Sequence, residues 1–219
     1  MGLLEAIGNL HIINVVLCAL IGVVFTLWFI PRILVVSFKK KLFDFADERK
    51  VHTGVVPRLG GVAFVPSILI SVSLMAGISS LVLPGDANVF VVPTLQMAFG
   101  LCSLILLYFE GIMDDLVGLR YRVKFVIQIL CALLIVASGI WLNDFHGLFG
   151  LAGLSPWFGV PFSVLLVVFI INAINLIDGI DGLASGLSIV SAFFFGIMFC
   201  YEGYWGFAML AFSLMGTLV

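Results

Sequence analysis

Long apolar runs alternate with short polar segments along most of this 219-residue chain. A helix needs about 20 apolar residues to cross a bilayer, so six of these runs predict full transmembrane spans. The six runs are Ile12–Val36, Gly61–Leu83, Val91–Ile112, Phe125–Leu142, Val160–Ile177 and Leu187–Tyr201. A seventh run begins near Trp205 and reaches Val219 without a polar flank. The pattern predicts an all-α, polytopic bundle forming one transmembrane domain over residues 1–219, truncated in its seventh span at the C-terminus.

The composition agrees with this hydrophobic pattern. The chain is 63% hydrophobic and only 10% charged, with a mean hydropathy of +1.30. A soluble domain is closer to half apolar and about a quarter charged. We therefore expect a membrane environment and no nucleic-acid partner.

The placement of the basic residues predicts the orientation. None lies before the first run, between the second and third, or between the fourth and fifth. By the positive-inside rule, the loops after runs one, three and five are cytoplasmic and the N-terminus lies outside. The basic residues are Arg32, Lys39, Lys40, Lys41, Arg49, Lys50 and Arg58 at or after the first run, and Arg120, Arg122 and Lys124 after the third.

The most unusual polar stretch separates the fifth and sixth runs. Its two carboxamides and two carboxylates recur at steps of three, and they would follow one face if the segment stayed helical. Gly179 and Gly182 allow the backbone to leave the helix and a ligand to approach closely. An ionised carboxylate at membrane depth costs about 2.5–3.5 kcal/mol, so a pair of them indicates function rather than a simple turn. The four polar residues are Asn172, Asn175, Asp178 and Asp181.

A second acidic pair, Asp114 and Asp115, ends the third run. The C-terminal end of a helix dipole disfavours acids, and like charges this close oppose each other's ionisation unless a cation lies between them. Lys124 and Gln128 follow in the next run, four residues apart, so they are expected to face the same cavity.

The first cytoplasmic loop carries a third polar group. Its basic side chains have two readings: they follow membrane topology and bind anionic headgroups, or they bind phosphate together with the backbone N–H groups of the turn. The interleaving with turn-forming residues before the second run favours phosphate for Arg49, Lys50, His52 and Arg58.

The predicted topology brings these three groups to one cytoplasmic rim. Carboxylates without paired His or Cys ligands favour a hard divalent cation, Mg²⁺ or Mn²⁺. A metal ion beside Arg, Lys and His suits a diphosphate substrate, because phosphoryl transfer depends mainly on positioning and charge neutralisation. A site at the membrane surface implies one water-soluble substrate and one lipid.

With these residues the chain resembles the polyprenyl-phosphate N-acetylhexosamine-1-phosphate transferases, glycosyltransferase family 4. Within the family, the segment Pro57-Arg58-Leu59-Gly60-Gly61 is similar to that of the enzymes that start O-antigen, common-antigen or teichoic-acid chains. The enzymes that load UDP-MurNAc-pentapeptide usually have a different pair of residues between this Pro and the Gly-Gly. That second branch stays open as an alternative. The matching motifs are Arg49-Lys50-Val51-His52 with the Pro57–Gly61 segment, Asp114-Asp115 with Lys124, and the long stretch Asn172–Ala184.

The resemblance implies an Mg²⁺-dependent enzyme of the inner membrane that transfers N-acetylhexosamine 1-phosphate, most simply from UDP-GlcNAc, to undecaprenyl phosphate and releases UMP. Dimers are common among related enzymes. The implied catalytic residues are Asp114, Asp115, Asp178 and Asp181, with Asp114, Asp115 and Asp178 as metal ligands. Asn172 and Asn175 would line the nucleotide-sugar pocket, while Lys124, Arg49, Lys50, His52 and Arg58 would contact phosphates.

One departure from the family concerns later motifs. The family also uses a downstream Gly-Asp-x-Gly-Ser-type aspartate and a His-rich loop, and neither occurs before Val219. We therefore expect the sequence to be a fragment of a longer protein.

Three other classes fit less well. An ion-coupled transporter would place its acids near the bilayer midplane, whereas these lie at span ends. A phosphotransferase acting on cytidine diphospholipids would continue Asp-Gly into Ala-Arg, but Ile180 and Asp181 follow Gly179 here. An intramembrane aspartyl protease would carry Tyr-Asp and Gly-x-Gly-Asp in mid-span, and the sequence has neither.

Overall fold

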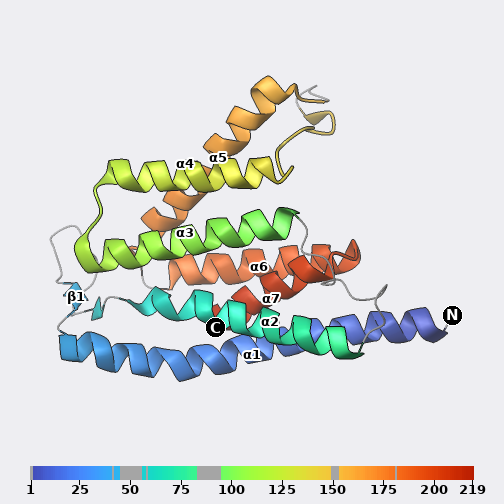
Figure 1. The fold of residues 1–219 in the computed structure, drawn as a ribbon, viewed down its shortest axis with the longest axis horizontal. Coiled ribbons are helices and arrows are strands. Elements are labelled where there is room, and N and C mark those ends of the chain that lie inside the picture. Colours follow the sequence, from blue (N-terminus) through green and yellow to red (C-terminus); the bar gives the residue numbers. More distant parts are fainter. Residues whose placement is uncertain are drawn as a thin grey trace. The chain divides into compact units, whose positions relative to one another are not determined.

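The computed structural model describes residues 2–40, 42–44, 56–57, 59–82, 95–148, 153–180 and 182–219. The described elements are helical except for one pair of two-residue strands, which confirms the all-α prediction (Figure 1). In chain order they are α1 (Gly2–Lys40), β1 (Phe43–Asp44), β2 (Val56–Pro57), the 3-10 helix η1 (Gly60–Ala63), α2 (Phe64–Val82), α3 (Leu95–Val117), α4 (Tyr121–Ala137), α5 (Pro156–Ile177), α6 (Leu183–Tyr201) and α7 (Trp205–Leu218).

Five helical segments are long and apolar enough to cross a membrane, so the chain is a multi-pass membrane protein. Helix α4 has 17 residues, the lower limit for a spanning helix, and α7 has 14. The fourth predicted run was expected to reach Leu142, but its helix ends at Ala137. Gly139 follows with φ of +91°, a left-handed conformation that glycine adopts without a Cβ clash. The five segments are Leu10–Lys40, Gly60–Val82, Leu95–Val117, Pro156–Ile177 and Leu183–Tyr201.

The chain divides into two compact units. The first unit comprises Met1–Val92 and Asp178–Val219, and it holds α1, α2, α6 and α7. The second unit is Pro93–Ile177, with α3, α4 and α5. The single domain expected over residues 1–219 stays a prediction, and each unit is described by itself below.

Small residues hold the first unit together. Helix α7 packs against α1, α2 and α6. A Cβ atom built at Gly216 would lie 2.2 Å from the carbonyl oxygen of Ala19, so only glycine permits this approach of α7 to α1. Ser71 of α2 and Ser213 of α7 share a hydrogen bond between their buried hydroxyls. Close backbone approach and buried neutral hydrogen bonds therefore contribute to this packing, together with the apolar core cluster of α1, α2 and α7.

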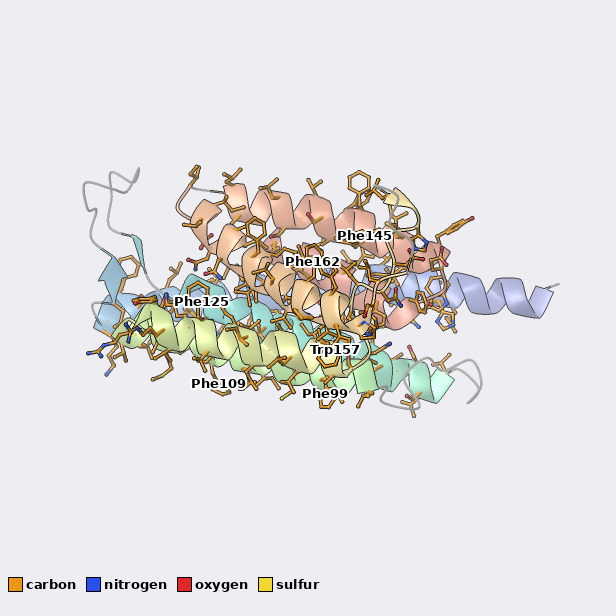
Figure 2. All side chains as sticks on the ribbon, turned by 90° about the horizontal axis from the view of Figure 1, so that it is seen from above. Phe99, Phe109, Phe125, Phe145, Trp157 and Phe162 are labelled. Carbon is orange, nitrogen blue, oxygen red and sulfur yellow. The ribbon has the colours of Figure 1, made fainter. Side chains whose placement is uncertain are left out.

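Helix α4 is central to the second unit, because it packs against both α3 and α5. The Ser103 hydroxyl of α3 donates to the carbonyl oxygen of Cys131 on α4 at 3.1 Å. At the α5 end, Phe145 and Phe162 meet edge to face with ring centroids 6.0 Å apart (Figure 2). Trp157, also labelled in Figure 2, is 92% exposed at the start of α5, as suits an aromatic side chain at a membrane interface.

Candidate functional site

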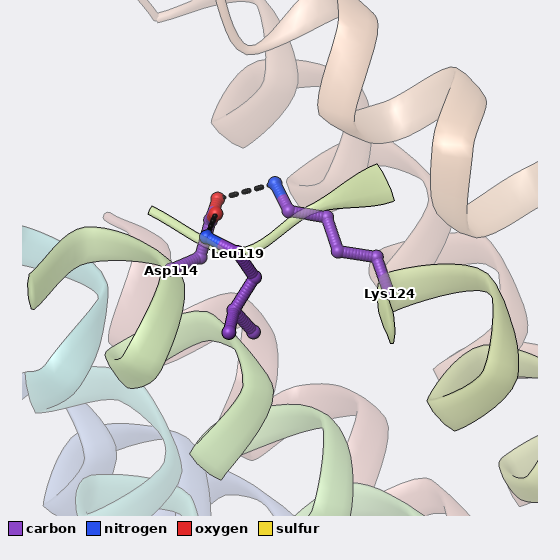
Figure 3. A network of polar contacts seen from close by, with 3 residues as sticks. All are labelled: Asp114, Leu119 and Lys124. Atoms are coloured by element: carbon purple, nitrogen blue, oxygen red, sulfur yellow. Dashed lines mark hydrogen bonds and ion pairs between the residues drawn. The ribbon is translucent and has the colours of Figure 1, made fainter. Parts of the chain in front are cut away.

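The end of α3 is closed by the side chain of Asp114. The backbone N–H of Gly118 donates to the Asp114 carbonyl oxygen at 2.9 Å, and Gly118 takes a left-handed conformation with φ of +73°. The chain turns back, and the N–H of Leu119 donates to Asp114 Oδ1 at 2.9 Å (Figure 3). The loop from α3 to α4 is therefore organised around this carboxylate.

Lys124 of α4 reaches across the same loop to Asp114. Its Nζ atom donates to Asp114 Oδ2 at 2.5 Å, the contact dashed in Figure 3. The two side chains are 27% and 32% exposed, so the pair is shielded but still reached by solvent. A cation thus compensates an acid at the C-terminal end of α3, where the helix dipole disfavours negative charge.

Two further carboxylates accompany this pair on α3. Asp115 lies next to Asp114 in the last turn and is half-buried. Glu110 lies one turn earlier on the Asp114 side of the helix and interacts electrostatically with both Lys124 and Asp114. Sequence reasoning gave Glu110 no role, although its four-residue spacing from Asp114 was a signal that the two share a face.

The second polar contact joins α4 to α5. Asn172 Nδ2 donates to Gln128 Oε1 at 2.6 Å and to the carbonyl oxygen of Val168 at 2.8 Å. Gln128 is only 4% exposed. Lys124 and Gln128 were expected to face one cavity, but Lys124 contacts α3 and Gln128 contacts α5, so they reach different neighbours.

The sequence allowed either a continuous helix or a glycine turn across the motif of Asn and Asp residues, and the structure has the turn. Helix α5 ends at Ile177, Asp178 and Gly179 form a turn, and α6 starts after Gly182, whose φ is +73°. Asn172 and Asn175 therefore share a helix, whereas Asp178 lies in an exposed turn of the first unit. The glycines explain the break, as the sequence also allowed.

Five of the predicted site residues lie outside the described residues. Of the basic loop, the structure describes its two ends, where Phe43 pairs with Pro57 and Asp44 with Val56 in an antiparallel ladder. The two ends of the loop are thereby held together. The five residues are Arg49, Lys50, His52, Arg58 and Asp181.

The oxygen-only donor set remains the chemistry that Mg²⁺ prefers. Within the described residues, no three His, Cys, Asp or Glu side chains gather closely enough to hold a metal ion. The expected ligands Asp114, Asp115 and Asp178 are divided between the two units. Asp114 instead binds Lys124 and the Leu119 N–H. Mg²⁺ binding by these three aspartates therefore stays a prediction.

Comparison with known proteins gives one family. The sequence model described as "Glycosyl transferase family 4" matches residues 97–219, which include both polar contacts of the second unit. The chain is 32% identical over 181 residues to the "Probable undecaprenyl-phosphate N-acetylglucosaminyl 1-phosphate transferase" of Bacillus subtilis, covering 82% of this chain and 47% of that protein. It is 31% identical over 202 residues to the "Undecaprenyl-phosphate alpha-N-acetylglucosaminyl 1-phosphate transferase" of Salmonella typhi, covering 89% and 50%.

A second type of relative also matches. The "Phospho-N-acetylmuramoyl-pentapeptide-transferase" of Listeria monocytogenes serovar 1/2a is 27% identical over 196 residues, covering 87% of this chain and 59% of that protein. The chain spans about half the length of the two N-acetylglucosaminyl 1-phosphate transferases, since the shares are 47% and 50%. The similarity therefore concerns a part of those enzymes that includes the acidic pair and the Asn172 motif.

Proposed function

The chain belongs to glycosyl transferase family 4, and from this premise we propose that it transfers a sugar 1-phosphate from a nucleotide sugar to undecaprenyl phosphate at the membrane surface. The observation that carries the proposal is the Asp114–Lys124 ion pair, which lies at a helix end within the matched region. Relatives named for undecaprenyl-phosphate N-acetylglucosaminyl 1-phosphate transfer support it. From the motif resemblance we further propose UDP-GlcNAc as the donor, UMP as the leaving product and surface-polysaccharide initiation as the role.

In the proposed reaction, an oxygen of the lipid phosphate attacks the phosphorus that carries the sugar. A new P–O bond forms to the sugar-bearing phosphorus. The P–O bond between that phosphorus and the bridging oxygen of the diphosphate breaks, and UMP leaves with the electron pair of the broken bond. Lys124 orients Asp114 and supplies positive charge near the reacting phosphates. Asp114 or Asp115 accepts the proton of the lipid phosphate. When bound, Mg²⁺ or Mn²⁺ would neutralise negative charge on the diphosphate, and Asp114, Asp115 and Asp178 are the ligands that we propose for it.

A two-step route through an aspartyl phosphate is the competing mechanism. Direct attack inverts the configuration at the transferred phosphorus, whereas two successive displacements restore it. A chiral, isotopically labelled phosphate in the donor separates the two routes. Inversion supports direct attack, and net retention contradicts it.

The remaining residues receive roles by their motifs. We assign Asn172, Asn175 and Asp181 to binding of the nucleotide sugar. The basic residues of the first loop would contact phosphates, which suits their charge. These basic residues are Arg49, Lys50, His52 and Arg58.

We further propose six full spans, a cytoplasmic site, an external N-terminus and a homodimer in the inner membrane. The clustering of basic residues after the first and third runs supports the orientation. Cysteine labelling from either side of sealed vesicles tests it: positions 122 and 147 are expected to react from opposite sides.

The decisive experiment offers the purified complete protein undecaprenyl phosphate, Mg²⁺ and a panel of UDP-sugars in detergent. UMP release with a lipid-linked GlcNAc product is the expected result, and Asp114→Asn serves as the inactive control. Use of UDP-MurNAc-pentapeptide instead would assign the chain to the other branch. Detergent holds no ion gradient, so UMP release there cannot come from a gradient-driven transporter. Absence of UMP release with every donor overturns the transferase proposal and favours the transporter.

A further inference from the structure

Gln128 is a long polar side chain buried inside a membrane-spanning unit. Together with Cys131 and Ala132 it forms the buried face of α4, and it is 4% exposed. A buried amide at this depth is unfavourable unless its polar atoms are bonded. Its hydrogen bond to Asn172 of α5 supplies a partner, and that residue lies in the motif assigned above to the nucleotide sugar.

The contacts of Asn172 settle which way both amides point. The carbonyl oxygen of Val168 only accepts hydrogen bonds, so the Asn172 atom 2.8 Å away must be the nitrogen Nδ2. That nitrogen also lies 2.6 Å from the Gln128 side chain, so Gln128 presents its oxygen Oε1. The two hydrogens of Nδ2 are thus both donated within the second unit.

What remains for a ligand is the oxygen of Asn172. Its side chain is half-buried, and Oδ1 has no hydrogen-bond partner within the described part of the chain. An amide oxygen accepts from hydroxyl or N–H groups, and it repels a phosphate oxygen. The orientation of the amide therefore determines which part of a nucleotide sugar can bind there.

We propose that Gln128 is a positioning residue that fixes the Asn172 amide so that Oδ1 accepts a hydrogen bond from a hydroxyl or N–H group of the nucleotide sugar. This inference rests on the proposed function, and it adds a residue on α4 that no motif includes. Without the Gln128 oxygen, one Nδ2 hydrogen would lack its partner and the amide would rotate more freely. Binding of the nucleotide sugar would weaken, while the phosphate chemistry at Asp114 and Lys124 would stay intact.

The test compares steady-state kinetics of purified variants with UDP-GlcNAc and undecaprenyl phosphate. Gln128→Leu is expected to raise the KM for UDP-GlcNAc about tenfold, the loss of one buried hydrogen bond, with kcat and the KM for the lipid within about twofold. Gln128→Glu keeps an acceptor oxygen at the same reach and is expected to stay within about threefold of wild type. Ser103→Ala removes another interhelical hydrogen bond of the same unit and serves as the matched control, with an unchanged KM.

A double-mutant cycle asks whether Gln128 acts through Asn172. In an Asn172→Ala background, adding Gln128→Leu is expected to change the KM by less than about twofold, because the group it positions is already gone. Equal tenfold effects in both backgrounds overturn the inference, as does a Gln128→Leu enzyme with wild-type KM. A parallel fall in kcat and melting temperature also overturns it, since that result indicates a purely structural role. An inactive wild-type protein overturns the proposed function itself, whereas the outcomes above concern only Gln128 and require an active wild-type protein.

Discussion

Two polar contacts, one in each unit, differ in kind. In the first unit, neutral groups such as the Ser71 and Ser213 hydroxyls are fully buried and bond to each other. In the second unit, the ion pair of Asp114 and Lys124 leaves about a third of each side chain exposed, at 32% and 27%. The buried hydroxyls bond to each other and are not exposed to solvent, whereas the ion pair keeps its charged atoms accessible to solvent.

This difference separates packing from chemistry. Short neutral hydrogen bonds between membrane helices contribute only about 0.6 kcal/mol on average, so they mainly fix helix positions. Charges at a helix end cost more to keep and need partners. Asp114 accepts hydrogen bonds from Lys124 and from the Leu119 N–H, and a substrate phosphate is able to share the lysine. Substitutions at the contact between Ser71 and Ser213 should therefore change stability, and substitutions at the ion pair of Asp114 and Lys124 should change activity.

The largest expected effect is on activity, from Lys124→Met. It removes the cation that orients Asp114, and we expect kcat/KM to fall about a thousandfold with little change in melting temperature. Arg122→Met makes the same charge change at an exposed neighbour and is expected to stay within about threefold. Near-normal turnover by Lys124→Met would remove the ion pair from the catalytic site.

The next largest effect is on stability, from Gly216→Ala. The added Cβ would lie 2.2 Å from the Ala19 carbonyl oxygen, so α7 must move away from α1. We expect a loss of about 1–3 kcal/mol in the free energy of unfolding, with normal activity per folded molecule. Gly77→Ala on α2 is the control, because nothing lies within 4 Å of its added Cβ. Equal stability of the two variants would contradict the close packing of α1 and α7.

A smaller loss in the free energy of unfolding is expected for Ser213→Ala, which breaks the hydrogen bond to Ser71. The loss should be about 1 kcal/mol, the contribution of one buried hydrogen bond, because the Ser71 hydroxyl still donates to the carbonyl oxygen of Ile68 at 2.9 Å. Reversible unfolding in mixed micelles measures it. Adding Ser71→Ala should cost less than it costs alone, since the hydrogen bond between the two hydroxyls is already gone. A changed KM for either substrate would break the proposed division between packing and chemistry.

The smallest effect is a pH dependence at Asp144, beyond the other end of α4. The backbone N–H groups of Gly153 and His146 donate to Asp144 Oδ1 at 3.1 and 2.7 Å, and they lower the pKa of this carboxyl. A lowered folded-state pKa contributes stability above the ordinary value of about 3.9 and loses it as pH falls through the folded-state pKa. Asp144→Asn should therefore flatten the acid side of a plot of melting temperature against pH while turnover stays unchanged. Identical acid profiles for the two proteins would contradict this role.

One contact of the candidate site could be anticipated from local sequence. The need of Asp114 for a cation followed from its place at a helix end, and Lys124 supplies that cation only ten residues later. The sequence left the end of α5 open. The three-residue spacing of the Asn and Asp residues is compatible with a continuing helix, while Gly179 and Gly182 permit a break. In the structure the turn prevails, so Asp178 leaves the helix that carries Asn175.

The sequence by itself determined the apolar runs, the two acidic motifs and the glycine turns, because hydropathy, charge and φ preference are properties of neighbouring residues. Only the tertiary structure decided that Gln128 meets Asn172, 44 residues away, and that Lys124 turns instead toward α3. Such contacts depend on how each helix is rotated against the next. That rotation is set by the packing of whole faces, which no single stretch of sequence contains.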